Sequence, residues 1–181
     1  MQRYTKLGTD WANVSNTPYK LYKTNAHKGG TCTPLIAFWP KGIVGTKRIS
    51  HSLGHFIDFM PTLIDVSNAK YPNVFNGEKI VAMQGESLLP VFKNKKTDRE
   101  KPLFWHYGKG KAIQNNQWRL VSDGEQAWSL YNMKTDKTET IDLSQKYPEV
   151  LRQMEELHKQ WMDSNPIQKK KRRSKRKVAK K

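Results

Sequence analysis

The stretch of the sequence with the most chemical potential is KTNAHKGGTCTP, residues 23–34. It combines two lysines, a histidine, a glycine pair and Cys32, the only cysteine of the chain. A lysine beside a glycine turn can hold an anion, because the ammonium is a compact charge and glycine lets backbone N–H groups approach a ligand. Three hypotheses follow: an anion site, a cysteine nucleophile site, or a basic turn that leads into a strand. Local chemistry alone favours the basic turn, because a lone lysine ahead of a glycine pair is a weak motif.

As a nucleophile, Cys32 would need a lowered pKa or a base nearby. His27 and Lys28 are close to it in sequence, which does not place them close in space. We therefore interpret Cys32 as a small buried apolar residue at the start of a strand. A single cysteine also excludes an internal disulfide and a cysteine-based zinc site.

The histidines show no spacing typical of a metal site, and we predict core or surface roles for all five. His51 and His55 are four residues apart, but the glutamate of a zinc-binding helix does not follow the first of them. We expect neither a metal ligand set nor a catalytic residue within this chain. The other histidines are His27, His106 and His158.

The last thirteen residues, 169–181, hold ten Lys or Arg and no acidic residue. Without them the net charge falls from +17 to +7, from 23 basic and 16 acidic residues. Blocks of like charge repel, stay disordered and act as interaction arms. Phosphate backbones, anionic membranes and import receptors would all attract such an arm. We predict polyanion binding without sequence preference, by Lys169, Lys170, Lys171, Arg172, Arg173, Lys175, Arg176 and Lys177.

Several elements must position these residues. The run PLIAFWP, 34–40, is apolar and bounded by prolines, which predicts a strand covered on both faces. Without its neighbouring strands it would expose apolar side chains. Residues 55–69 have helical apolar spacing, with Asp58 as a candidate cap and Pro61 in the first turn.

From Pro102 the pattern changes to short segments rich in aromatic and β-branched residues, separated by Gly and Asn turns. This predicts a meander of antiparallel strands. The segment that follows has one apolar face, which predicts a helix packed on the meander. That face comprises Val150, Leu151, Met154, Leu157, Trp161 and Met162.

The first sixteen residues contain no apolar stretch that could serve as a secretory signal, and no segment approaches the ~18 apolar residues of a membrane helix. We expect either a cytosolic chain or the downstream part of an exported one, and no transmembrane segment.

The order of several motifs strongly resembles the C-terminal part of the sulfatase (arylsulfatase) family. The resemblance runs from about residue 8 to 163 and rests on WANVSNTPYKLYK…HKGGTCTPLIAFWPKGI, HFIDFMPTLIDVSNAKYP, GESLLPVF, PLFWHYGKGKAIQNNQWRLVS and WSLYNMKTDKTETIDLSQKYPE. In sulfatases a lysine a few residues before the glycine pair contacts the substrate sulfate, and Lys23 matches it. The resemblance thus favours the anion-site hypothesis, for Lys23 alone.

This chain departs from the family pattern in two places and lacks two other parts of it. Lys28 stands where family members usually have an acidic residue, and WHYGKG, 105–110, stands where they often read Trp-Glu-His-Glu-Gly-Asn. The family nucleophile is formed within C/S-x-P-x-R, far upstream of the lysine turn. CTPLI mimics three of these positions, but Ile36 replaces the arginine. The upstream calcium ligands are also absent.

The resemblance implies an α/β fold: the end of a sulfatase-type α/β catalytic domain, residues 1–101, then a small antiparallel sheet with a C-terminal helix, 102–164, and a basic tail, 165–181. It implies the C-terminal part of a sulfuric ester hydrolase. We expect this part to be inactive alone and to meet a sulfate ester only together with the N-terminal half. Calcium belongs to the intact family, and no cofactor is expected for this chain. Family members are often secreted or periplasmic. The alternative is a non-catalytic basic protein that binds polyanions through its tail.

Overall fold

The computed structural model describes the chain except residues 1–7, 46–47, 96, 125–126 and 166–181. The predicted polyanion-binding residues of the tail lie outside the described residues. The elements in chain order are α1 (Thr9–Ser15), α2 (Lys28–Thr31), a 3-10 turn (Phe56–Asp58), α3 (Phe59–Ser67), β1 (Val74–Phe75), β2 (Glu78–Lys79), α4 (Leu89–Phe92), β3 (Leu103–Tyr107), β4 (Gly110–Gln114), β5 (Trp118–Ser122), β6 (Ser129–Asn132) and α5 (Pro148–Ser164).

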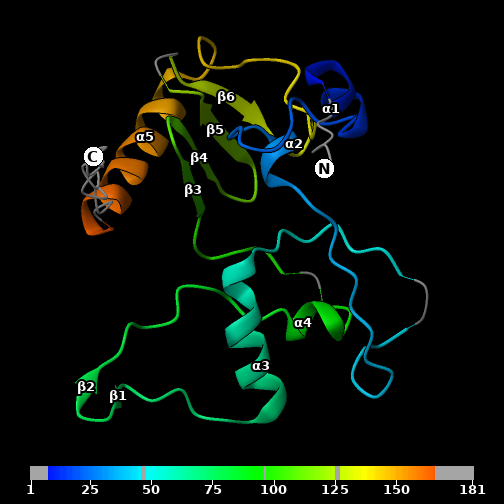
Figure 1. The fold of residues 1–181 in the computed structure, drawn as a ribbon, viewed down its shortest axis with the longest axis vertical. Helices are drawn as coiled ribbons and strands as arrows, with labels where there is room; N and C mark the ends of the chain where they lie inside the picture. The colour runs from blue at the N-terminus through cyan, green and yellow to red at the C-terminus, as the bar shows by residue number, and fades with distance from the viewer. Residues whose placement is uncertain (1–7, 46–47, 96, 125–126, 166–181) are drawn as a thin grey trace, which may run out of the picture.

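The four longer strands form an antiparallel sheet of order β3-β4-β5-β6, as the sequence predicts (Figure 1). Each strand pairs with the next along the chain, which is the meander topology. Asn115 shapes the β4–β5 turn, because its Oδ1 accepts hydrogen bonds from the backbone N–H groups of Gln117 (2.9 Å) and Trp118 (2.6 Å). The α/β fold class is thus confirmed: helices with antiparallel sheets, the larger of which is followed by a C-terminal helix.

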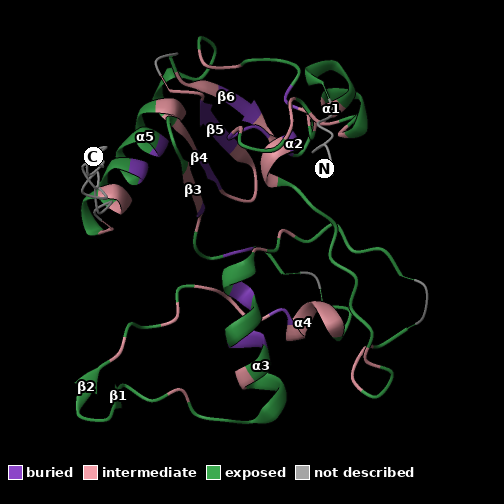
Figure 2. Cartoon of the chain, in the orientation of Figure 1, coloured by how far each residue is buried: buried purple, intermediate pink, exposed green. Residues whose placement is uncertain are grey.

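Both faces of this sheet are covered, and each strand contributes to both. One face packs on α5 through a core that includes Ile113, Leu120, Leu130 and Met154. The other face packs against the segment that leads into α2, with Ala26 set on Ala112, Val121, Tyr131 and Met133. Figure 2 shows this burial, in purple, concentrated in the strands. The sheet is therefore the middle of three layers, and the segment that contains the lysine turn packs on one of its faces.

Helix α5 presents the predicted face to the sheet, with one correction. Met154 is buried and Trp161 stacks on Phe104, with ring centroids 5.0 Å apart. Leu157 is 43% exposed, whereas His158 is buried beside it. The assignment of Leu157 to the core was wrong because the rotation of the helix places the next residue, His158, on the buried line.

His158 lies among aromatic rings, with centroids 5.2 Å from Trp128 and 5.9 Å from Trp161. Its Nε2 is buried and has no hydrogen-bond partner among the residues that the structure describes. Burial, with the charges of Lys111 and His106, lowers the pKa of His158 to about 4. The imidazole is therefore neutral in the folded chain at neutral pH.

This burial predicts a loss of stability in acid. Between pH ~6.5, the ordinary histidine pKa, and the native value, the unfolded chain binds a proton at His158 that the folded chain does not. The free energy of unfolding should therefore fall as pH falls through this window. Chemical denaturation at several pH values measures the slope, and His158→Phe should flatten it. An equal slope in both proteins would show that His158 is not the group responsible.

The strand predicted at 34–40 is absent, and this expectation was wrong. Residues 32–39 have no regular secondary structure, and the side chains of Ile36 and Phe38 are 91% and 90% exposed. A strand needs a neighbour for its backbone groups, and no described segment pairs with this one. The exposure of its apolar side chains is what the sequence predicts for this run without neighbouring strands.

The helix predicted at 55–69 is confirmed as the 3-10 turn and α3. Asp58 has a larger role than the cap it was assigned. Its carboxylate is fully buried and receives two hydrogen bonds from Arg99, at 2.6 Å and 2.9 Å. It also accepts from the backbone N–H groups of His55 (2.8 Å) and Glu86 (2.9 Å). This pair ties α3 to the segment that enters β3. Among the described residues, no helix is long and apolar enough to cross a membrane.

Candidate anion-binding site

The candidate site is the turn around Lys23. The backbone of this turn passes close to the two glycines that follow it, Gly29 and Gly30. A Cβ atom on Gly29 would lie 1.9 Å from the carbonyl oxygen of Leu21, and one on Gly30 would lie 2.2 Å from that of Asn25. Only glycine permits such an approach. The glycine N–H groups are also in use, because Gly29 donates to Lys20 O (2.9 Å) and Gly30 donates to His27 O (2.9 Å). The glycine pair therefore shapes the turn, and its N–H groups do not face a ligand.

Lys23 itself is exposed, and its side chain lines a broad cleft between the sheet and the segment 33–59. The backbone around it is bent tightly, with Leu21 at φ +63° and Thr24 at φ +80°. Such conformations persist in residues other than glycine only where the surroundings fix them. An exposed ammonium on a fixed turn is suited to meeting an anion in a set position.

His27 fixes the turn through contacts with two carboxylates. The sequence analysis predicted only a core or surface role for this histidine. Its ring is buried between two carboxylates: Nδ1 is 2.9 Å from Glu139 Oε2, and Nε2 is 3.3 Å from Asp123 Oδ2. Asp123 also accepts from the N–H of Ala26 through Oδ1, at 3.3 Å. With both ring nitrogens engaged, His27 is not available as the base of a cysteine nucleophile.

Arg119 completes this buried network from the middle of β5. Its Nε donates to Glu139 Oε1 at 2.7 Å, and its two terminal nitrogens donate to Gln114 Oε1 (2.9 Å), Ala26 O (2.6 Å) and Thr31 Oγ1 (2.9 Å). The guanidinium also lies over the ring of Trp105, 4.7 Å from its centroid. One side chain thus joins the sheet to both ends of the HKGG segment.

Glu139 is the centre of the network, although nothing in the sequence singles it out. Both carboxylate oxygens are used: Oε1 by Arg119, and Oε2 by His27 and by the backbone N–H of Lys28 at 3.0 Å. Burial alone would raise the pKa of this carboxyl, but the hydrogen bond from His27 and the charge of Arg119 outweigh it and lower the pKa. Glu139 is therefore a buried, ionised anchor.

The sequence carried one signal for this network. Arg119 and Val121 are two residues apart in β5, so their side chains share one face of the sheet. Val121 is buried against Ala26, so the charged Arg119 occupies a core position of the strand. A charge at such a position requires a buried partner. The partner could not be named, because Glu139 lies in a loop beyond the next strand and 20 residues away in sequence.

Cys32 is exposed at the end of α2, and the prediction of a buried thiol was wrong. The reason is the missing strand, because Cys32 begins the exposed segment rather than a covered one. No group of three or more His, Cys, Asp or Glu side chains that could hold a metal occurs in the parts of the chain that the structure describes.

The model of one protein family, described as "N-sulphoglucosamine sulphohydrolase, C-terminal", matches residues 21–165. A sulfatase of Formosa agariphila is 27% identical over 161 residues, which cover 80% of this chain and 28% of that protein. The N-acetylgalactosamine-6-sulfatase of Mus musculus is 32% identical over 125 residues, 67% of this chain and 22% of that protein. This chain thus spans less than a third of the length of these relatives.

Among solved structures, the crystal structure of Ps i-CgsB superposes with a TM-score of 0.67 and 27% identity, over 80% of this chain and 32% of that one. The same protein was solved in complex with k-i-k-neocarrahexaose, at 28% identity and the same TM-score of 0.67.

Proposed function

This chain belongs to the sulfatase family, as its C-terminal part, and we propose that it forms one wall of a sulfatase active site in which Lys23 holds the sulfate group of the substrate. The observation that carries the proposal is the position of Lys23. Its side chain is exposed on a turn whose next segment is bonded to buried Glu139, and Arg119 of the sheet binds Glu139 in turn. Because the backbone of Lys23 is fixed, its ammonium starts close to the charge that develops in the reaction.

The chemistry of sulfate ester hydrolysis explains why a cation at this place is useful. When the S–O bond to the sugar or aryl group breaks, negative charge grows on the sulfate oxygens and on the leaving oxygen. An ammonium group in a water-poor cleft stabilises that charge more in the transition state than in the ground state. Lys23 would supply this electrostatic part of the reaction and no covalent step.

The covalent step requires residues that we assign to the part of the relatives that this chain does not span. Cys32 sits in CTPLI without the arginine of the family motif, and His27 is engaged on both sides. The described residues also offer no ligand set that fits the calcium ion of the family. We therefore derive no step through calcium from this chain.

The substrate class that we propose is a sulfated carbohydrate. Relatives of this chain include the N-acetylglucosamine-6-O-sulfatase of Bacteroides thetaiotaomicron, 28% identical over 156 residues, and N-acetylgalactosamine-6-sulfatases. The cleft beside Lys23 also contains Tyr107, whose exposed ring offers a flat apolar surface to a sugar.

The isolated chain 1–181 should not hydrolyse 4-nitrophenyl sulfate or N-acetylglucosamine 6-sulfate. Fused behind the upstream part of the Formosa agariphila sulfatase, in place of the region that it matches, it should restore hydrolysis. Both statements are checked by release of sulfate or nitrophenolate. Turnover by the isolated chain that disappears in Cys32→Ala would overturn the assignment of the nucleophile to the missing part.

A further inference from the structure

Besides Lys23, the lysines that line the same cleft are Lys28, Lys95 and Lys137. The side chains of Lys28 and Lys137 have no role in the network described above. Lys28 is the first residue of α2, and Lys137 lies in the loop between β6 and Glu139. We propose that Lys28 and Lys137 form a second anion subsite, which binds a second acidic group of the same substrate. The proposal rests on the proposed function, and it specifies a carbohydrate with at least two anionic groups.

The cleft is large enough for such a substrate. Its volume is about 1610 Å³, and Lys23, Lys28 and Lys137 all line it. Sites for one small molecule have volumes of roughly 300–1,000 Å³. The cleft therefore has room for an oligosaccharide with charged groups on more than one sugar, or for a sugar that carries two of them.

Lys28 is held in place through its backbone. Its N–H donates to Glu139 Oε2 at 3.0 Å, and its ammonium lies 5.3 Å from the centroid of the Tyr19 ring. The side chain is half-buried, in contrast to an ordinary surface lysine. Its direction is therefore set by neighbours rather than by free rotation in solvent.

The ammonium groups of this pair of lysines have no direct partner. Neither Lys28 nor Lys137 forms an ion pair with any other residue that the structure describes. Both oxygens of Glu139 accept hydrogen bonds from Arg119, His27 and the backbone of residue 28. The charge of Glu139 still attracts Lys28, but its oxygens are not free to bind the ammonium directly.

The electrostatics of Lys28 point the same way. Burial lowers its pKa most, and among the neighbouring charges Arg119 and Lys137 lower it further, while Cys32 and Glu139 oppose the shift. The positive charges of Arg119 and Lys137 thus repel the ammonium of Lys28, which is already partly desolvated by burial. An anion bound between Lys28 and Lys137 would relieve this repulsion, and water would do so less well.

The test compares two probes as competitive inhibitors of 4-nitrophenyl sulfate hydrolysis by the fusion described above: glucosamine 6-sulfate, with one anionic group, and glucosamine 2-N,6-O-disulfate, with two. Lys28→Met removes the charge but keeps the stem and the backbone bond to Glu139, so the fold is retained. We expect Lys28→Met to weaken binding of the disulfate about tenfold and leave the monosulfate unchanged. Lys28→Arg should restore the preference.

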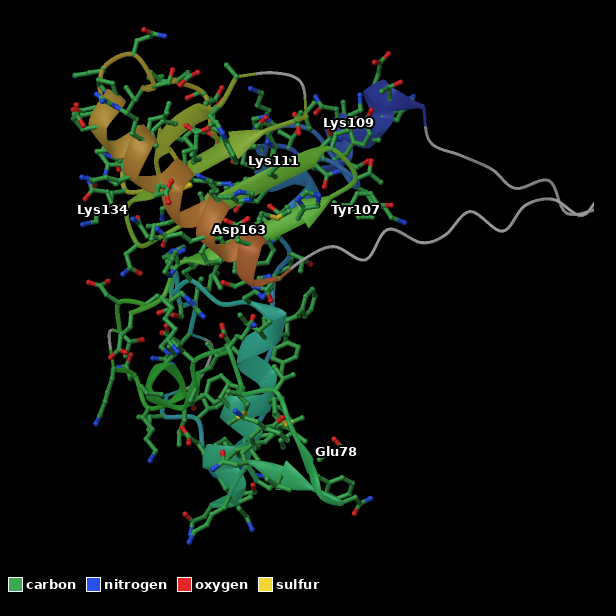
Figure 3. The ribbon with its side chains drawn as sticks, turned by 90° about the vertical axis from the view of Figure 1, so that its left-hand side faces the viewer. Glu78, Tyr107, Lys109, Lys111, Lys134 and Asp163 are labelled. Atoms are coloured by element: carbon green, nitrogen blue, oxygen red, sulfur yellow. The ribbon has the colours of Figure 1, made fainter. Side chains whose placement is uncertain are left out.

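Lys134→Met is the matched control. Lys134 is exposed, lies outside the cleft and is seen in Figure 3 far from Tyr107 and Lys109 across the sheet. It should change neither affinity, and the same basic tail is present in every variant. The second subsite is overturned if Lys28→Met leaves the disulfate affinity unchanged or weakens both probes equally. The role of Lys23 fails separately, if Lys23→Ala leaves the rate of hydrolysis unchanged.

Discussion

Replacing Lys23 by alanine in a sulfatase that has this chain as its C-terminal part should slow hydrolysis by about 10²–10³-fold. The expected loss is that of one donor to developing charge in a dry site, roughly 3–4 kcal/mol. It should appear mainly in kcat, because the charge on the sulfate oxygens grows as the ester bond breaks. Steady-state kinetics of the fusion proposed above measure it.

Two variants frame this result. Lys23→Arg keeps the charge but changes its shape, so it should recover part of the rate. Lys134→Ala removes an exposed lysine outside the cleft and should have no effect. A rate unchanged by Lys23→Ala would remove Lys23 from the active site, and an equal loss in both alanine variants would indicate only an effect of net charge.

The second large effect concerns stability. Glu139→Ala should lower the free energy of unfolding by about 3–5 kcal/mol, because it leaves the fully buried Arg119 without its carboxylate. His27 and the backbone N–H of Lys28 lose their partner in the same step. Urea denaturation followed by tryptophan fluorescence reports the change, since Trp105 lies against Arg119.

A double-mutant cycle of Arg119→Met and Glu139→Gln separates the ion pair from simple loss of packing. The double variant removes both charges, and it should be clearly more stable than expected from the sum of the two single losses, because each single variant leaves one buried group without its partner. Glu156→Ala is the surface control. The carboxylate of Glu156 is exposed, and its ion pair with Lys159 is loose, at 4.0 Å. Its removal should lower the free energy of unfolding by less than about 1 kcal/mol. Equal losses in the single and double variants would show that the buried pair is not what matters.

The same pair makes a pH prediction whose sign follows from the lowered pKa of Glu139. A carboxyl with a lower pKa in the folded state contributes stability above its unfolded value, about 4.3, and loses it as the pH falls through the native value. The wild-type chain should therefore lose stability relative to the double variant only in acid, below that pH.

Much of the fold was predictable because its elements are local. The meander follows from short apolar segments between Gly and Asn turns, and α5 follows from one apolar face. A helix or hairpin is stabilised largely by residues near in sequence, and the pattern records those. The turn around Lys23 was one of the hypotheses from the local sequence. The role of Lys23 as a sulfate ligand comes from the resemblance to sulfatases and stays a prediction.

The parts that could not be predicted depend on residues distant in sequence. Whether 34–40 is a strand depends on neighbouring strands, which the pattern of one segment does not reveal. The exposure of Cys32 followed from that same segment. The network of His27, Arg119 and Glu139 joins three parts of the chain, and only the unusual place of Arg119 in β5 gave any indication of it.

The bond between His27 and Glu139 joins residues 112 positions apart, and this has a consequence for how the chain folds. The lysine turn is fixed only when the whole loop between them closes. The entropy cost of closing a loop grows slowly with its length, by only about 0.6 kcal/mol for each doubling. Insertions or deletions within residues 33–100 should therefore change the stability of the contacts that fix the Lys23 turn only slightly. We expect the turn itself to be among the last features to form, because contacts between residues distant in sequence form slowly.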